Sequence, residues 1–210
     1  MSKILICVPC MDMVASGFAQ SLAMLQKGGH ETAICFECGS LIYDARNKLA
    51  KRAIEMGADY TMWFDSDMIF QPDTMLKLLE HKDEGGVISG LYFRRSPHYT
   101  PVVFAKCNIR ERSWADLEEI PTELCEVEGV GFGCVLVSTD VLMSMAAKNW
   151  RWFEPLKGFG EDLSFCWRAR ECGYKIILDP SVKCGHVGHI VVTEQFFHLY
   201  EGGHKNEDQS

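Results

Sequence analysis

The chain has 210 residues, a length that suits one domain with a substantial buried core. Its hydrophobic residues (47%) and charged residues (24%) are in proportions ordinary for a globular protein. The net charge of −8 counts against a surface built to bind nucleic acid without regard to sequence. No apolar run has the length of a transmembrane segment and the chain shows no signal peptide, so we expect a cytoplasmic protein whose ten cysteines are reduced thiols.

The first 65 residues alternate between strand and helix patterns. Strands are predicted at 3–9 and 32–36, with a third one ending at Asp65, and helices at 14–27 and 44–56. Glycine follows each of the two helices, as is typical of a helix C-terminus. This order predicts an α/β fold with a mostly parallel sheet and right-handed crossovers.

The rest of the chain is less regular. A helix capped by Asp73 is predicted at 72–81, and a strand at 86–93. From 94 to 125 the sequence is polar and contains proline, which predicts a mobile or substrate-contacting region. The pattern then resumes with a glycine-rich strand at 131–137, helices at 139–147 and 161–172, a strand at 175–178 and an amphipathic segment at 191–200.

Two carboxylates end the third predicted strand abruptly. Asp65 and Asp67 are two residues apart, so in extended geometry they point the same way at the edge where open α/β sheets bind ligands. Such a pair repels unless a metal or a shared proton accompanies it. Hard oxygen donors suit Mg²⁺ or Mn²⁺, above all an ion shared with a diphosphate. An isolated Asp-x-Asp is about as often a solvated acidic turn, so its position at a strand end carries the prediction.

Two later segments contain further candidate residues. Glu161 and Asp162 begin a predicted helix, where they act either as helix-capping carboxylates or as a general base for an acceptor hydroxyl. His186 and His189 lie in a glycine-flanked segment after the last predicted strand. Either histidine is a candidate to complete a metal site, and either is equally a structural residue.

Taken in order, these elements resemble the GT-A glycosyltransferases, specifically the family 2-like group common in bacteria and phages. The resemblance rests on Ala45-Arg46-Asn47, Gly57-Ala58-Asp59-Tyr60, Phe64-Asp65-Ser66-Asp67 and Gly160-Glu161-Asp162. It implies a single Rossmann-like GT-A domain over residues 1–202, with a nucleotide-sugar half at about 1–93 and an acceptor half at about 94–202. The polar tail at 203–210 is expected to be disordered.

The resemblance also implies roles for individual residues. The nucleotide-sugar donor would be contacted by Pro9, Asp12, Glu37, Arg46, Asn47, Asp65 and Ser66. The Mn²⁺ or Mg²⁺ ligands would be Asp65, Asp67 and His186. Asp162, beside Glu161, would be the general base that gives inversion, although some GT-A enzymes with a late metal-binding histidine retain configuration. Glu37 stands in Phe36-Glu37-Cys38-Gly39, where family 2 commonly has Asp-Asp-Gly-Ser.

By the same resemblance the donor is most often a UDP-sugar. The acceptor is a glycan, a lipid-linked sugar, a protein side chain or a modified DNA base. Two other functions fit parts of the sequence. One is a haloacid-dehalogenase-like phosphotransferase with Asp65 as nucleophile and Asp67 as acid/base, and the other is a non-catalytic sugar- or nucleotide-binding protein of the same fold.

Three further motifs allow two interpretations each. The Cys-x-x-Cys pairs at 7–10 and 35–38 either gather four thiols around zinc or pack as small apolar residues. The glycines at 129–133 do not form a phosphate-binding loop, and we expect them to let the backbone approach the donor sugar or the acceptor closely. Trp150, Trp152 and Phe153 are either an acceptor platform or core residues.

Overall fold

The computed structural model describes residues 1–39, 41–96 and 98–188. His189, the predicted amphipathic segment at 191–200 and the predicted tail at 203–210 lie outside the described residues. The helices are α1 (Ser16–Met24), α2 (Ile42–Glu55), α3 (Thr74–Glu80), α4 (Thr139–Ala147) and α5 (Glu161–Glu171). None of the helices in the described ranges is long and apolar enough to cross a membrane.

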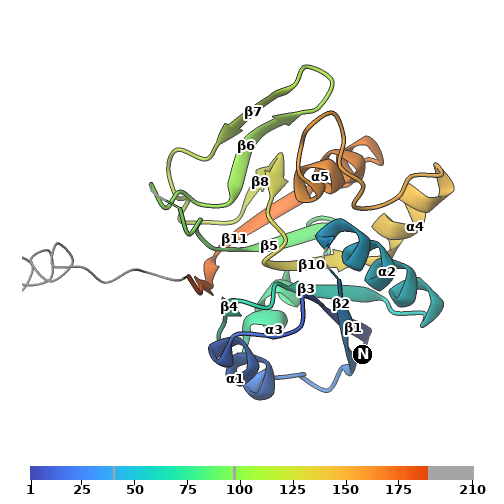
Figure 1. Cartoon of the computed structure of the whole chain (residues 1–210), viewed down its shortest axis with the longest axis vertical. Coiled ribbons are helices and arrows are strands. Elements are labelled where there is room, and N and C mark those ends of the chain that lie inside the picture. The colour runs from blue at the N-terminus through green and yellow to red at the C-terminus, as the bar shows by residue number, and fades with distance from the viewer. Residues whose placement is uncertain (40, 97, 189–210) are drawn as a thin grey trace, which may run out of the picture.

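A seven-stranded sheet runs through the middle of the molecule in the order β2-β1-β3-β10-β5-β11-β8 (Figure 1). Its strands are β1 (Lys3–Cys10), β2 (Glu31–Cys38), β3 (Tyr60–Phe64), β5 (Val87–Leu91), β8 (Cys125–Val127), β10 (Cys134–Ser138) and β11 (Ile176–Lys183). Parallel pairing of β1 with β2 and β3 confirms the predicted start of the fold. Strand β10 runs antiparallel between β3 and β5, and β8 is an antiparallel edge strand, so the sheet is mixed but mostly parallel, as predicted.

Helices cover both faces of this sheet, as the apolar strands require. Along β1, Leu5 and Cys7 belong to a core that includes residues of α2, α4 and α5. Ile4 and Ile6 point to the other face, where they join a core with residues of α1 and α3. Neighbouring strand residues alternate between faces, so one apolar run contributes to both cores.

Two small ribbons flank the sheet. β4 (Met68–Ile69) pairs with β12 (Gly185–His186), and β6 (Val103–Asn108) lies between β7 (Ser113–Asp116) and β9 (Gly129–Val130). The β6–β7 hairpin falls in the region at 94–125, which we predicted to be mobile or substrate-contacting and to which we assigned no strand. Its register shifts between Phe104 and Lys106, and such an irregularity interrupts the alternation by which a strand is recognised in sequence.

Two smaller predictions are wrong in detail. Asp73 is the N-cap residue of α3, but its side chain makes no capping hydrogen bond and instead pairs with Lys77 Nζ at 3.0 Å. Strand β11 continues to Lys183, beyond the predicted end at 178. It passes Pro180 where the pairing register with β5 shifts between Asp179 and Lys183, because an irregular position needs no ladder N–H from proline.

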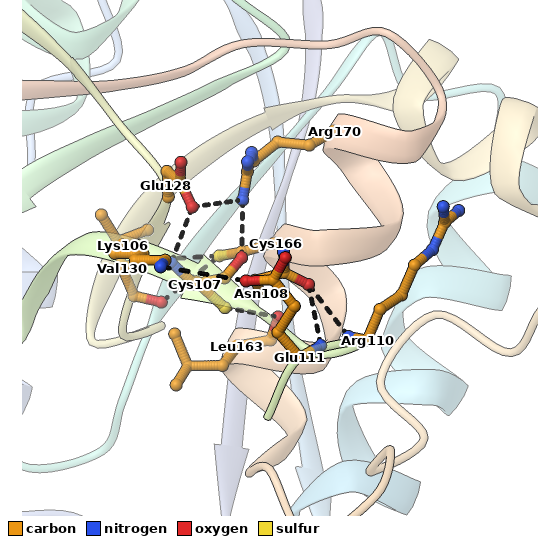
Figure 2. A network of polar contacts seen from close by, with 10 residues as sticks. All are labelled: Lys106, Cys107, Asn108, Arg110, Glu111, Glu128, Val130, Leu163, Cys166 and Arg170. Carbon is orange, nitrogen blue, oxygen red and sulfur yellow. Dashed lines mark hydrogen bonds and ion pairs between the residues drawn. The ribbon is translucent and has the colours of Figure 1, made fainter. Parts of the chain in front are cut away.

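The β6–β7 hairpin is joined to α5 by a cluster of polar contacts (Figure 2). Arg170 Nη1 donates to the carbonyl of Cys107 at 2.8 Å and pairs with Glu128 Oε2 at 3.1 Å. The same Glu128 oxygen accepts the Cys107 backbone N–H at 2.7 Å, and the Val130 N–H donates to Cys166 Sγ at 3.4 Å. These contacts join the middle and the last turn of α5 to β6 and β9.

Candidate functional site

A cavity of about 370 Å³ opens at the C-terminal ends of β1, β2 and β3. Parallel strands end at one edge of a sheet, which is where α/β folds bind ligands. The cavity brings together residues far apart in sequence from our predicted site, namely Pro9, Arg46, Asp65, Ser66, Asp67, Glu161 and His186. It is also lined by Arg95, which the sequence analysis did not assign.

Asp65 and Asp67 follow β3 in a turn, not in the extended geometry that we expected. The Met68 N–H donates to the Asp65 carbonyl at 3.1 Å and closes this turn. Asp65 Oδ1 accepts from Arg46 Nη2 at 2.8 Å, and its own N–H donates to the Gly133 carbonyl at 3.3 Å. Burial raises the pKa of Asp65 above its usual value, and the charge of Arg46 only partly opposes that rise.

Asp67 lies between two cationic partners. Its Oδ2 is 2.8 Å from Arg95 Nη1, and its Oδ1 is 3.5 Å from His186 Nε2. Burial raises the pKa of Asp67, but the hydrogen bond and charge of His186 and the charge of Arg95 outweigh it, so the net pKa is lowered. Asp67 is therefore the more readily ionised of the two carboxylates.

The β4–β12 ribbon holds His186 against Asp67. His186 lies opposite Met68 in the ribbon, and the Val187 N–H donates to the Asp67 carbonyl at 2.8 Å. His186 Nδ1 is 2.9 Å from the carbonyl oxygen of Phe93, to which it donates. The hydrogen bond with Asp67 raises the pKa of His186, so a metal would bind Nε2 in place of its proton, while Nδ1 keeps the bond to the carbonyl as in metal-binding histidines.

The cation site that these residues offer is smaller than the one predicted. No group of three or more His, Cys, Asp or Glu side chains is close enough to hold a metal within residues 1–39, 41–96 and 98–188. Asp67 and His186 form a pair, whereas Asp65 is bonded to Arg46. Two protein ligands suit Mg²⁺ or Mn²⁺ when a bound diphosphate supplies further oxygens. The donor set therefore fits a cation shared with a substrate.

Arg46 is the most deeply buried charge at the cavity. Its residue is 3% exposed, and the guanidinium lies 5.3 Å from the ring centroid of Phe132 and 5.8 Å from that of Phe153. Nη2 bonds Asp65, and Nε is 3.8 Å from Glu161 Oε1, beyond hydrogen-bond distance. Within the described chain, Nε and Nη1 have no hydrogen-bond partner. Unpaired buried N–H groups are costly, so an anionic ligand is the expected partner.

Glu161 and Asp162 begin α5, as the sequence predicts. Gly160 is the N-cap residue, and Asp162 Oδ1 accepts the Leu163 N–H at 2.7 Å. Burial and the charge of Glu161 raise the pKa of Asp162 to about 6, against the opposing charge of Arg46. A carboxylate with this pKa is suited to accept a proton near neutral pH. Glu161 lines the cavity, whereas Asp162 lies just behind it in the first turn of the helix.

Three predicted donor-binding residues do not line the cavity. Asp12 is exposed in the segment after β1. Glu37 Oε1 pairs with Lys48 Nζ at 3.2 Å. Asn47 is buried, and its Oδ1 accepts the Phe153 N–H at 3.0 Å. Successive residues of a helix point about 100° apart, so Arg46 and Asn47 face different surroundings. Contact of these three residues with a nucleotide stays a prediction.

Two of the glycines at 129–133, Gly131 and Gly133, are explained by Tyr92, which the sequence analysis also missed. A Cβ atom on Gly131 would lie 2.0 Å from the Tyr92 hydroxyl oxygen, and one on Gly133 would lie 2.9 Å from Tyr92 Cζ. The Gly133 N–H donates to that hydroxyl at 3.2 Å. These two glycines make room for a buried phenol, where we expected them to make room for a sugar. Tyr92 thereby holds Gly133, the residue whose carbonyl accepts the Asp65 N–H.

The zinc hypothesis fails on geometry. Cys7 and Cys10 are three residues apart in β1, so they point to opposite faces of the sheet, as do Cys35 and Cys38 in β2. Cys10 and Cys38 face each other with their sulfurs 3.5 Å apart, a pair and not a four-thiol cluster.

For two of the three aromatic residues at 150–153, the structure decides between an acceptor platform and the core. Trp152 Nε1 donates to the carbonyl of Leu142, and Phe153 is fully buried against Phe165. Trp150 is partly buried and packs beside Trp167, their ring centroids 5.9 Å apart. Trp152 and Phe153 are therefore core residues, not an acceptor platform.

Comparisons with known proteins give structural matches alone. No family model and no curated protein sequence matches the chain. The crystal structure of A197 from STIV superposes with a TM-score of 0.64 at 19% identity, covering 90% of this chain and 87% of that one. The crystal structure of GalNAc-T7 with UDP, GalNAc and Mn²⁺ has a TM-score of 0.63 at 10% identity, covering 90% of this chain.

The second match involves part of a larger protein, since it covers only 44% of the GalNAc-T7 chain. Identities this low carry information about the backbone and not about substrates. The mostly parallel sheet, the helices on both of its faces and this structural match together confirm the predicted architecture. The chain has the GT-A fold of the glycosyltransferases.

Proposed function

We propose that this protein is a metal-dependent glycosyltransferase that moves a sugar from a nucleoside diphosphate to an acceptor hydroxyl. The observation that carries the proposal is Arg46, a residue of the cavity lining whose buried guanidinium has two nitrogens, Nε and Nη1, without a partner among the described residues. It lies next to a carboxylate–histidine pair suited to a cation, Asp67 with His186. A diphosphate with its metal would satisfy both features at once.

The residues of the cavity divide the work of donor binding. Asp67 and His186 would hold Mn²⁺ or Mg²⁺, which when bound neutralises charge on the leaving diphosphate. Arg46 would donate to phosphate oxygens through its unpaired nitrogens, and Asp65 keeps its guanidinium in position. Ser66 and Pro9 line the same cavity and would contact the donor, for which a UDP-sugar is the first candidate.

Asp162 would accept the proton of the acceptor hydroxyl. Its pKa of about 6 leaves it ionised at neutral pH yet basic enough to take a proton as the hydroxyl attacks. Attack assisted by such a base, on the face of the sugar opposite the diphosphate, inverts the anomeric configuration. Glu161, between Asp162 and Arg46, raises the basicity of Asp162 through its negative charge.

The test is calorimetric titration with UDP, with and without Mn²⁺, on wild type and Asp67→Ala. Metal-dependent binding by wild type that is lost in the variant supports the proposal. The matched control is Asp73→Ala, because Asp73 is a half-exposed aspartate whose partner is Lys77 on its own helix. Equal binding by wild type and Asp67→Ala, with both proteins folded by circular dichroism, would contradict it.

Activity assays separate the proposal from its two rivals. Hydrolysis of UDP-sugars that requires Mn²⁺ supports a transferase, since water replaces an absent acceptor. Hydrolysis of an aryl phosphate that depends on Asp65 would support the phosphotransferase. Tight UDP binding without sugar release, across glycan, lipid-linked, peptide and DNA acceptors, would support the non-catalytic binding protein.

A further inference from the structure

Adjacent arginines after β5 have different surroundings. Arg94 is built into the hairpin, with Nη2 2.8 Å from Asp116 Oδ1 and its guanidinium over the ring of Phe104. Arg95 turns instead into the cavity, where Nη1 is 2.8 Å from Asp67 Oδ2 and donates to the Val187 carbonyl at 3.1 Å. Its side chain is 49% exposed, so it can reorient without disturbing the core.

The contact of Arg95 with Asp67 conflicts with cation binding by that carboxylate. Arg95 bonds Oδ2 and His186 faces Oδ1, so the guanidinium occupies one of the two oxygens available to a metal. Its positive charge would also repel a divalent ion placed a few ångströms away. A diphosphate has the opposite effect, because its oxygens are better partners for a planar guanidinium than one shared carboxylate oxygen.

Arg46 has no such freedom. It is 3% exposed, lies over two aromatic rings and bonds Asp65 at 2.8 Å. Moving it would leave the partly buried carboxylate of Asp65 unpaired, which is unfavourable. The two aspartates therefore differ in what a ligand can do to them: Asp65 stays with its arginine, whereas Asp67 can be released by the movement of one half-exposed side chain.

We propose that Arg95 is a positioning residue that exchanges partners, pairing with Asp67 in the free protein and with the diphosphate once the donor and its cation are bound. This inference rests on the proposed function. It has a thermodynamic consequence, because a ligand that draws Arg95 away from Asp67 strengthens cation binding, and the cation strengthens ligand binding by the same factor. Cation alone should bind weakly.

The experiment measures two affinities in wild type and in Arg95→Ala by calorimetry. The first is for Mn²⁺ without nucleotide, and the second is for UDP at saturating Mn²⁺. We expect the variant to bind Mn²⁺ alone about fivefold more tightly, because a competing charge is gone. We expect it to bind UDP about tenfold more weakly, because a charge-assisted hydrogen bond is gone. The two changes have opposite signs, which a general loss of structure does not produce.

Two further variants complete the test. Arg110→Ala removes the same charge from an arginine that pairs with Glu171 outside this cavity, so neither affinity should change. Arg95→Lys keeps the charge but not the planar fork, so Mn²⁺ affinity should stay near wild type while UDP affinity falls.

The outcomes that overturn the exchange are equally specific. Mn²⁺ affinity that is unchanged, weaker or unmeasurable in both wild type and Arg95→Ala overturns the competition at Asp67. UDP affinity that is unchanged in Arg95→Ala overturns the contact with the diphosphate. If wild type binds Mn²⁺ but no nucleoside diphosphate, the proposed function fails, while the Mn²⁺ titration still decides whether Arg95 competes with a cation.

Discussion

The cavity at the ends of β1, β2 and β3 and the cluster between α5 and the β6–β7 hairpin both combine arginine with carboxylate. In the hairpin cluster, Arg170 and Glu128 close on the backbone of Cys107, and each finds its partner within the protein (Figure 2). In the cavity, buried Arg46 has two nitrogens for which the described part of the chain supplies no partner. Size does not distinguish the two, since the cavity beside Arg170 is the larger, about 480 Å³ against 370 Å³. Unpaired nitrogens alone do not distinguish them either, because Arg94 Nε beside the hairpin also lacks a partner among the described residues. What sets Arg46 apart is that it lines a cavity with the Asp67–His186 pair.

The largest expected effect concerns turnover. Asp162→Asn should lower the rate of sugar transfer or donor hydrolysis by a factor of at least about 100, because it removes a general base. UDP binding at saturating Mn²⁺ should stay within about twofold, since Asp162 would face the acceptor hydroxyl and not the diphosphate. Glu171→Gln, at the other end of α5, is the control that should keep the rate. A rate near wild type for Asp162→Asn would mean that Asp162 is not a general base. No catalytic role of Asp162 would then distinguish the cavity from the hairpin cluster.

Arg46 and Arg170 can be compared directly by the same conservative change. Arg46→Lys should weaken UDP binding about tenfold, because lysine lacks the planar fork that reaches both Asp65 and a phosphate. Arg170→Lys should leave UDP binding unchanged. Calorimetry at saturating Mn²⁺ measures both. Similar losses in the two variants would mean that unpaired nitrogens are a poor guide to ligand binding in this molecule.

The pH dependence of turnover follows from the raised pKa of Asp162, about 6 through burial and the charge of Glu161. A general base acts when ionised, so the transfer rate should rise with pH through about 6 and then level off. The rise should be absent from the residual rate of Asp162→Asn. For stability the sign is opposite: the folded state favours the protonated carboxyl, so the contribution of Asp162 to stability falls as pH rises from about 4 to 6.

The smallest effect on function is expected in the hairpin cluster. Arg170→Met should lower the free energy of unfolding by about 1 to 3 kcal/mol, because Glu128 and the Cys107 carbonyl lose a charged donor. UDP affinity should not change. Urea unfolding followed by circular dichroism gives the first quantity and calorimetry gives the second. A stability loss accompanied by weaker UDP binding would show that the cluster transmits its position to the cavity through α5.

Much of the parallel sheet and of the cavity could be predicted because the signals are local. The strand and helix periods up to Asp65, the acidic pair at a strand end and the acidic start of α5 all lie in short windows of sequence. The parallel sheet follows from their order. The resemblance to GT-A enzymes added the fold, which the structure and its neighbours confirm. The roles of the site residues remain predictions.

What could not be predicted depends on contacts between distant segments. Arg95 reaches Asp67 from 28 residues away, a contact that no pattern near either residue indicates. The register shift in β6 interrupts the alternating pattern, so the hairpin could not be recognised from the sequence. Asn47 is predicted from sequence to contact the nucleotide, yet its amide oxygen accepts a hydrogen bond from the Phe153 N–H. In each case tertiary structure determines which residue is the partner, and a local sequence pattern does not indicate that contact.

The paired thiols of Cys10 and Cys38 provide a natural position for a fluorescent label beside the cavity. The two sulfurs are 3.5 Å apart, Cys38 is exposed, and Cys10 lines the same cavity as Asp67. A thiol-reactive fluorophore would reach Cys38 first, because burial and the neighbouring thiol raise the pKa of Cys10 to about 11. The unmodified sequence thus offers a labelling position at the mouth of the cavity, from which ligand occupancy can be followed optically without introducing a new cysteine.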